Sequence, residues 1–162
     1  ISNLFGKYST LIDDFVTVLP KVDLPLNVSK TFTNKIYRTV STNKKINLYR
    51  GFGEPNAYLD GGYATTIKDA TREKLAILDE WGNSLRFEAL IEVPEKQILN
   101  IGKVEKQISS DGLQILNGGG DQVLVPRGWN YSNWVKSIKD KKTNIIYTFE
   151  EFEKAFPKLI TK

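Results

Sequence analysis

Polar residues at the end of a glycine run are the first candidates for chemistry in this sequence. Residues 118–128 read Gly-Gly-Gly-Asp-Gln-Val-Leu-Val-Pro-Arg-Gly. Consecutive glycines adopt backbone angles closed to other residues and let a ligand approach the chain closely. The apolar run 123–125 predicts a short buried strand. Asp121 and Gln122 therefore stand where a flexible loop enters a rigid strand, a junction that suits binding or chemistry, although an ordinary hairpin turn gives the same pattern.

Arg50 is a second polar residue that core packing does not explain. Residues 46–52 read Ile-Asn-Leu-Tyr-Arg-Gly-Phe, and Ile46, Leu48 and Arg50 alternate to one face of the predicted strand. An unpaired buried charge is costly, so Arg50 must find an anion. That anion is either a bound ligand or one of the 19 acidic side chains. We expect Arg50 and Gln122 to line the same cleft.

The residue types that are absent narrow the chemistry. The 162 residues include no His and no Cys, which excludes Ser-His triads, Cys nucleophiles, His general bases and zinc sites with His or Cys ligands. We expect no metal, and chemistry that uses carboxylates, amides, hydroxyls, Arg, Lys or the backbone. The net charge of +4 permits a phosphate-bearing ligand or an acidic partner but is too small to argue for nucleic acid. No apolar run approaches the roughly 20 residues that span a bilayer.

The elements that must position these side chains follow from the spacing of apolar residues. The composition, 40% hydrophobic and 26% charged, is typical of a globular domain. Helices are predicted over residues 8–19, 30–40, 69–81 and 131–138 and from Thr148, where Glu151 completes a capping box. Strands are predicted over residues 46–52, 61–66, 85–94, 97–104, 123–125 and 144–147.

These elements predict a single α+β domain. Residues 1–45 form a helical cover, residues 46–128 form a sheet core with the site, and residues 129–162 form C-terminal helices. The strands alternate apolar and polar residues and are not regularly interleaved with helices. We therefore expect helices flanking a split, mostly antiparallel sheet.

Three short segments, taken in order, resemble the ADP-ribosyltransferase-like fold of bacterial toxins. That family carries an Arg on its first strand, a Ser-Thr-Ser-like strand, and a catalytic Glu on a strand often followed by Leu-Pro-Arg-Gly-like residues. Arg50 matches the first segment, and Thr65 and Thr66 match the second in part, with Ala64 where a Ser is usual. Gln122 stands at the position of the Glu. A Gln amide can hydrogen-bond a ribose hydroxyl. It brings no negative charge, however, whereas the family's Glu stabilises the positive charge that grows as nicotinamide leaves.

The glycine segment adds a second resemblance. Residues 118–122, Gly-Gly-Gly-Asp-Gln, are similar to the Gly-Gly-Gly-x-Gln segment of tuberculosis necrotizing toxin-type NAD glycohydrolases. The resemblance implies that NAD is the substrate and that Arg50 and Gln122 are catalytic. Asp121 would supply the missing negative charge only if it turned inward, whereas adjacent strand residues point to opposite faces. The resemblance implies an NAD-binding set of Arg50, Gly51, Tyr63, Thr65, Thr66, Gly120 and Asp121.

The resemblance also implies a biological setting. It predicts the C-terminal catalytic domain of a larger bacterial polymorphic toxin, delivered into the cytoplasm of a target cell, where it cleaves NAD to nicotinamide and ADP-ribose. A cognate immunity protein would be its partner. A start at Ile1 and the lack of Met also lead us to expect a piece of a longer chain. Three alternatives stay open: a mono-ADP-ribosyltransferase that modifies a target protein, a ribonuclease toxin that works without His, and a binding module without activity.

Overall fold

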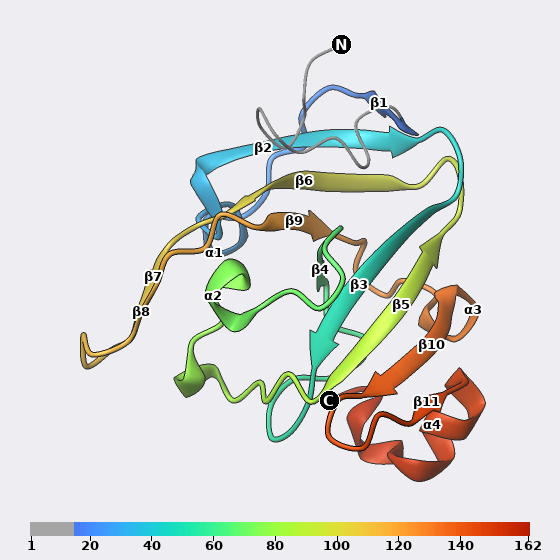
Figure 1. Ribbon diagram of the computed structural model, residues 1–162. Helices are drawn as coiled ribbons and strands as arrows, with labels where there is room; N and C mark the ends of the chain where they lie inside the picture. Colours follow the sequence, from blue (N-terminus) through green and yellow to red (C-terminus); the bar gives the residue numbers. More distant parts are fainter. Residues whose placement is uncertain (1–14) are drawn as a thin grey trace.

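The computed structural model describes residues 15–162, which form an α+β fold dominated by antiparallel strands (Figure 1). Within these residues, one sheet has the strand order β1-β2-β6-β9-β4, with β1 Val16–Val18, β2 Phe32–Thr42, β6 Ile98–Val104, β9 Asp121–Leu124 and β4 Tyr63–Ala64. A second sheet has the order β11-β10-β5-β3, with β11 Ile146–Tyr147, β10 Val135–Asp140, β5 Phe87–Val93 and β3 Ile46–Phe52. The coarse prediction of α+β architecture with antiparallel strands is confirmed.

The described helices are short and lie around these sheets (Figure 1). They are α1 Leu26–Ser29, α2 Arg72–Leu75, α3 Tyr131–Trp134 and α4 Phe149–Ala155, with 3₁₀ helices at Asp79–Trp81 and Pro157–Leu159. The predicted capping box of α4 is confirmed, because the backbone N–H of Thr148 donates to Glu151 and the backbone N–H of Glu151 donates to the Thr148 hydroxyl. These bonds satisfy N–H groups at the start of the helix that have no partner within it.

One hydrophobic core joins the two sheets. Strands β3 and β5 contribute through strict alternation, as predicted, so that Leu48, Phe87 and Ile91 are fully buried. Strands β6 and β9 and helix α4 add apolar side chains to the same cluster. Tyr49 and Thr65 exchange two backbone hydrogen bonds, of 2.8 and 2.9 Å. This pair ties β3 to the end of β4 and so holds the two sheets together at the point where the candidate site lies.

The predicted helix over residues 30–40 is wrong, because these residues form most of β2. Asn34 and Lys35 adopt positive φ angles of 56° and 58°, and the pairing with β6 shifts register between Phe32 and Tyr37. This irregularity puts both Phe32 and Tyr37 on the buried side. The resulting spacing of apolar residues imitates a helical period. The idea of a helical cover over residues 1–45 therefore fails for the described part. The predicted helix over 8–19 lies mostly outside the described residues, and its end at Val16–Val18 is strand β1.

Two further helix predictions are too long. Helix α2 ends after a single turn because Ala76 adopts the left-handed conformation, with φ 48°. The predicted helix over 131–138 ends at Trp134, and the chain continues as β10 against β5. The exposed backbone edge of β5 supplies partners for this ladder, and tertiary pairing overrides a weak local helical preference. The predicted C-terminal helices over residues 129–162 therefore reduce to α3, α4 and one 3₁₀ turn.

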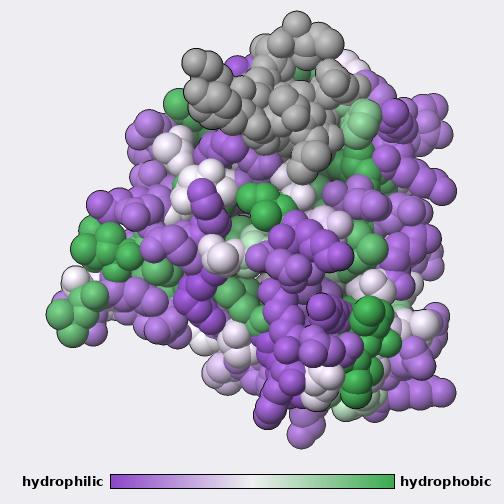
Figure 2. All heavy atoms as spheres, in the orientation of Figure 1, coloured by the Kyte–Doolittle hydropathy of each residue, from purple (hydrophilic) through white to green (hydrophobic). Residues whose placement is uncertain are grey.

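A two-stranded hairpin projects from the sheets beside the site. It consists of β7 (Gln107–Ile108) and β8 (Ile115–Leu116), and it extends away from the rest of the chain in Figure 1. Its apolar side chains Ile108, Leu113 and Ile115 are exposed, and Figure 2 shows hydrophobic atoms on this projection. Separately, no helix among residues 15–162 has the length and apolar character needed to cross a membrane.

Candidate functional site

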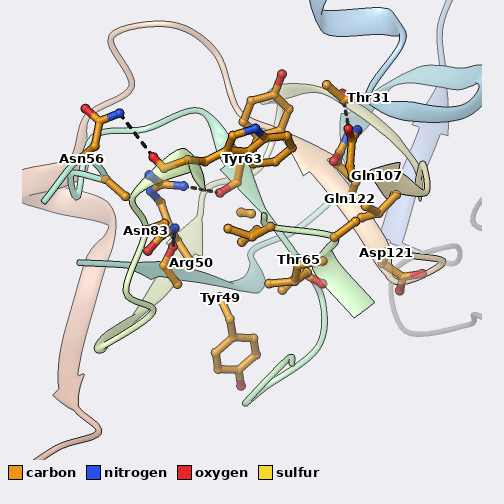
Figure 3. Close-up of a pocket in the computed structure, with 18 residues that line it drawn as sticks. Thr31, Tyr49, Arg50, Asn56, Tyr63, Thr65, Asn83, Gln107, Asp121 and Gln122 are labelled. Atoms are coloured by element: carbon orange, nitrogen blue, oxygen red, sulfur yellow. Dashed lines mark hydrogen bonds between the residues drawn. The ribbon is translucent and has the colours of Figure 1, made fainter. Parts of the chain in front are cut away.

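A cavity of about 250 Å³ lies where β3, β4 and β9 come together. Arg50 and Gln122 both line it, which confirms the prediction that they share a cleft. Figure 3 shows Arg50 on one side and Gln122 on the other, with Tyr63 and Thr65 between them. Its other lining residues include Thr31, Tyr49, Gly51, Asn56, Leu75, Ala76, Ile77, Trp81, Asn83, Gln107 and Asp121.

Arg50 is held by backbone carbonyls. Its guanidinium is buried and donates from Nε to the carbonyls of Tyr58 and Leu59, both at 3.2 Å. Nη1 donates to the carbonyl of Tyr63 and Nη2 to that of Tyr58, both at 2.8 Å. No carboxylate among residues 15–162 forms an ion pair with Arg50. Of the two anions considered for Arg50, a protein carboxylate is therefore not found among the described residues, and carbonyl dipoles of the loop after β3 and of Tyr63 in β4 hold the guanidinium.

Burial lowers the pKa of Arg50 to about 10, because the cavity wall removes water from the charged group, while the carboxylate of Asp60 acts in the opposite direction. Arg50 is therefore still a cation at neutral pH. A cation that is desolvated, and that neutral carbonyls hold in place, attracts an anionic group that enters the cavity. The geometry thus provides a fixed positive charge at the wall of the cavity.

Gln122 lies on β9, where it faces Gly102 of β6 in the strand register. Its side chain is buried and its Nε2 donates to the hydroxyl of Thr31 at 2.9 Å (Figure 3). Gly102 is required at its position because a Cβ there would lie 2.7 Å from the backbone oxygen of Ile36. Strand pairing and the bond to Thr31 together fix the amide at the cavity wall.

Asp121 points away from Gln122, as expected for adjacent strand residues (Figure 3). Its carboxylate accepts a hydrogen bond from the hydroxyl of Thr66 and lies 2.5 Å from the ammonium of Lys103. Thr66 is not one of the described residues that line the cavity. Asp121, Thr66 and Lys103 thus form a partly buried polar contact that links β9, β6 and the residues after β4. This contact steadies the strand on which Gln122 stands.

The glycine run packs against protein and leaves no free amides for a phosphate. The backbone N–H of Gly118 donates to the carbonyl of Glu73, and that of Gly120 donates to the carbonyl of Lys74, at 3.0 and 3.1 Å. A Cβ at Gly120 would lie 2.9 Å from the same Lys74 oxygen. Gly120 is not among the described residues that line the cavity. The glycines let the loop approach α2, and this contact places residues 75–77 in the cavity wall.

Three residues of the site were not singled out by the sequence. Thr31 precedes β2 in a stretch predicted as helix, and nothing in the local pattern links it to Gln122. Trp81 is 43% exposed and lines the cavity with Tyr63, which is 39% exposed. Asn83 donates from Nδ2 to the carbonyl of Gly51 at 3.2 Å and so supports the strand that carries Arg50. Its position directly after Gly82 is the one local signal that could have indicated a turn with a bonding role.

Comparison with protein-family models, curated proteins and solved structures found no match for this chain. Among the described residues, no group of His, Cys, Asp and Glu side chains could hold a metal ion. The distinctive features of the cavity are a buried cation that forms no ion pair within residues 15–162, a buried amide opposite it, and partly exposed aromatic rings.

Proposed function

We propose that this cavity binds NAD and that the chain cleaves the bond between nicotinamide and ribose. The observation that carries the proposal is that Arg50, buried and without an ion pair among residues 15–162, lines one cavity with the buried amide of Gln122. NAD supplies an anionic pyrophosphate for the first and ribose hydroxyls for the second. Tyr63 and Trp81 offer aromatic faces for a planar ring.

The arrangement of strands supports the same proposal. Strand β3 carries Arg50, β4 leads into Thr65, and β9 carries Gln122, and they meet where two antiparallel sheets join. This order is the one expected from the resemblance to the ADP-ribosyltransferase-like fold. We therefore propose that fold for the domain. We also propose the toxin role that the resemblance implies.

In the proposed reaction, the bond from the ribose carbon to the nicotinamide nitrogen breaks, and its electron pair leaves with nicotinamide. Gln122 holds a ribose hydroxyl while positive charge grows on the sugar, and water then adds to the ribose carbon and releases a proton. The cavity of about 250 Å³ is smaller than the roughly 300 to 1,000 Å³ of pockets that enclose drug-sized ligands. It therefore holds one end of the dinucleotide, and residues 75–77 shield that end from water.

The test is to incubate the purified chain with NAD and to quantify nicotinamide and ADP-ribose by chromatography. Gln122→Ala should lower turnover by about 100-fold or more, the usual scale for one well-placed polar group in a transition state. Gln97→Ala is the matched control, because Gln97 does not line the cavity and its side chain donates one hydrogen bond, to the neighbouring carbonyl of Ile98 at 3.5 Å. Wild-type chain that leaves NAD intact would contradict the proposal, and ADP-ribose attached to protein would show transfer in place of hydrolysis.

A further inference from the structure

We infer that Thr31 is a positioning residue that sets the direction of the Gln122 amide and makes the cavity selective for a ligand group that donates a hydrogen bond. This inference deepens the proposed function and rests on it for the identity of the ligand. The hydrogen bonds around Thr31 support the positioning role without any ligand, because they determine which end of the Gln122 amide faces Thr31.

The hydroxyl hydrogen of Thr31 has a fixed direction. The Oγ1 of Thr31 lies 2.6 Å from the carbonyl oxygen of Val28. A carbonyl oxygen only accepts, and a threonine hydroxyl has a single hydrogen. That hydrogen therefore points at Val28, in the last turn of α1, and only the lone pairs of Thr31 Oγ1 face any other neighbour.

The amide of Gln122 takes its direction from Thr31. Because Thr31 Oγ1 can only accept on this side, the amide end that lies 2.9 Å away must be the donor, Nε2. The amide oxygen Oε1 is then turned away from Thr31. No hydrogen bond from a described residue reaches this oxygen, although the Gln122 side chain is buried. A buried acceptor without a partner is costly, so a ligand that donates to Oε1 gains affinity.

The direction of the Gln122 amide makes the cavity selective for a ribose over a 2′-deoxyribose. A ribose has a 2′-hydroxyl beside the bond that breaks, and this hydroxyl can donate to Oε1. A 2′-deoxyribose cannot, and it leaves the buried oxygen without a partner. Sites built to bond a substrate hydroxyl reject the analogue that lacks it far more strongly than apolar pockets reject a missing methylene. If the amide could turn over freely, Nε2 would face the ligand part of the time and this discrimination would fall.

The amide itself can be observed without a ligand. In side-chain amide NMR spectra, the NH₂ signals of Gln122 are assigned by their loss in Gln122→Ala. We expect slow hydrogen exchange of these NH₂ protons in wild type and in Thr31→Ser, which keeps the hydroxyl. We expect exchange at least about tenfold faster in Thr31→Val and Thr31→Ala, which remove the acceptor. Circular dichroism checks that each variant is folded.

Thr33→Val is the matched control for this measurement. Thr33 lies two residues further on and donates its hydroxyl to the carbonyl of Val104 at 2.9 Å, so this variant also loses one bond from a threonine to a carbonyl. The Gln122 signals should exchange in Thr33→Val as they do in wild type. Unchanged exchange in both Thr31→Val and Thr31→Ala would overturn the inference, as would equally fast exchange in Thr31→Ser.

The selectivity is measured with NAD and its analogue with 2′-deoxyribose on the nicotinamide side. We expect wild type and Thr31→Ser to prefer NAD by about 100-fold or more in kcat/KM, and Thr31→Val to lose about tenfold of this preference. Equal rates for the two dinucleotides in wild type would overturn the inference while leaving the proposed hydrolysis intact. Conversely, a wild-type chain that does not act on NAD contradicts the proposed function, and the exchange measurement still decides the role of Thr31.

Discussion

Arg50 and Gly61 are in direct contact, and the guanidinium occupies the space that a side chain at Gly61 would fill. A Cβ at Gly61 would overlap Nη2 of Arg50 and lie 2.5 Å from its Cζ. The guanidinium is the far end of a long side chain, yet hydrogen bonds to the carbonyls of Tyr58, Leu59 and Tyr63 prevent it from moving aside. Gly61 therefore leaves the space that the Arg50 guanidinium needs, although it does not itself appear among the described residues that line the cavity.

Gly61→Ala should displace the guanidinium and loosen the loop between β3 and β4. We expect a loss of about 2 kcal/mol in the free energy of unfolding, the usual size for overpacking a filled site, together with loss of the proposed NAD cleavage. Gly62→Ala is the control, because its Cβ would lie 3.5 Å from Leu124, an ordinary contact. Urea unfolding compares the two variants, and equal losses of stability would contradict the role assigned to Gly61.

Arg50→Lys should separate the charge of Arg50 from its shape. The ammonium keeps the charge, but it lacks the planar set of donors that reaches three carbonyls at once. We expect a loss of stability of about 2 kcal/mol and weaker NAD binding, with more activity left than in Arg50→Ala. The exposed Arg38 of β2 provides the control Arg38→Lys. If Arg50→Lys has the same free energy of unfolding and the same affinity for NAD as wild type, the hydrogen bonds between the Arg50 guanidinium and the backbone carbonyls have no role in the site.

Glu88→Gln should stabilise the protein at neutral pH. Burial raises the pKa of Glu88, and a hydrogen bond from the backbone N–H of Asp69 opposes this effect in part. A raised folded-state pKa gives stability that is present below the unfolded-state pKa and lost as pH rises through the folded-state value. In Glu88→Gln the side-chain oxygen still accepts from the backbone N–H of Asp69, but the buried charge is gone. The variant should gain about 1 kcal/mol in the free energy of unfolding at neutral pH, which raises the melting temperature by a few degrees at this chain length.

The Glu88→Gln gain should shrink in acid, where the wild-type carboxyl is protonated and neutral. Thermal melts at several pH values measure this difference. The exposed Glu95 gives the control Glu95→Gln, for which no gain is expected. A gain for Glu88→Gln that stays the same from neutral to acidic pH would show that charge is not its cause.

Asp140→Asn should destabilise the protein in a manner that depends on pH. Asp140 is fully buried and accepts from Nε and Nη2 of Arg86 at 3.1 and 2.8 Å. The hydrogen bond with Arg86 is the largest cause that lowers the pKa of Asp140. A lowered folded-state pKa gives stability that is present above the unfolded-state pKa and lost as pH falls through the folded-state value.

We therefore expect Asp140→Asn to cost about 2 to 3 kcal/mol at neutral pH, with a smaller cost in acid. Denaturant titrations at both pH values check the difference, and the exposed Asp23 gives the control Asp23→Asn. Asp140 ends β10, Arg86 directly precedes β5, and neither residue lines the cavity, so the folded variant should keep the proposed NAD cleavage. An equal cost of Asp140→Asn at both pH values would rule out the ion pair as the source of the stability.

The sequence by itself determined the elements whose signals are local. Alternation of apolar and polar residues is enough to define β3 and β5, because each side chain of a strand points opposite to the next. The same alternation puts Arg50 among buried residues. The capping box of Thr148 and Glu151 is likewise set by two residues three positions apart.

Only the tertiary structure decided how β2 forms and what Arg50 and Gln122 bind. The irregularity at Asn34 and Lys35 gives β2 a helix-like apolar spacing, and only the pairing with β6 resolves it. Arg50 binds loop carbonyls, which every residue has and which no side-chain pattern can mark. Gln122 meets Thr31 across 91 positions of sequence. Such contacts depend on how the strands assemble, and local spacing carries no information about them.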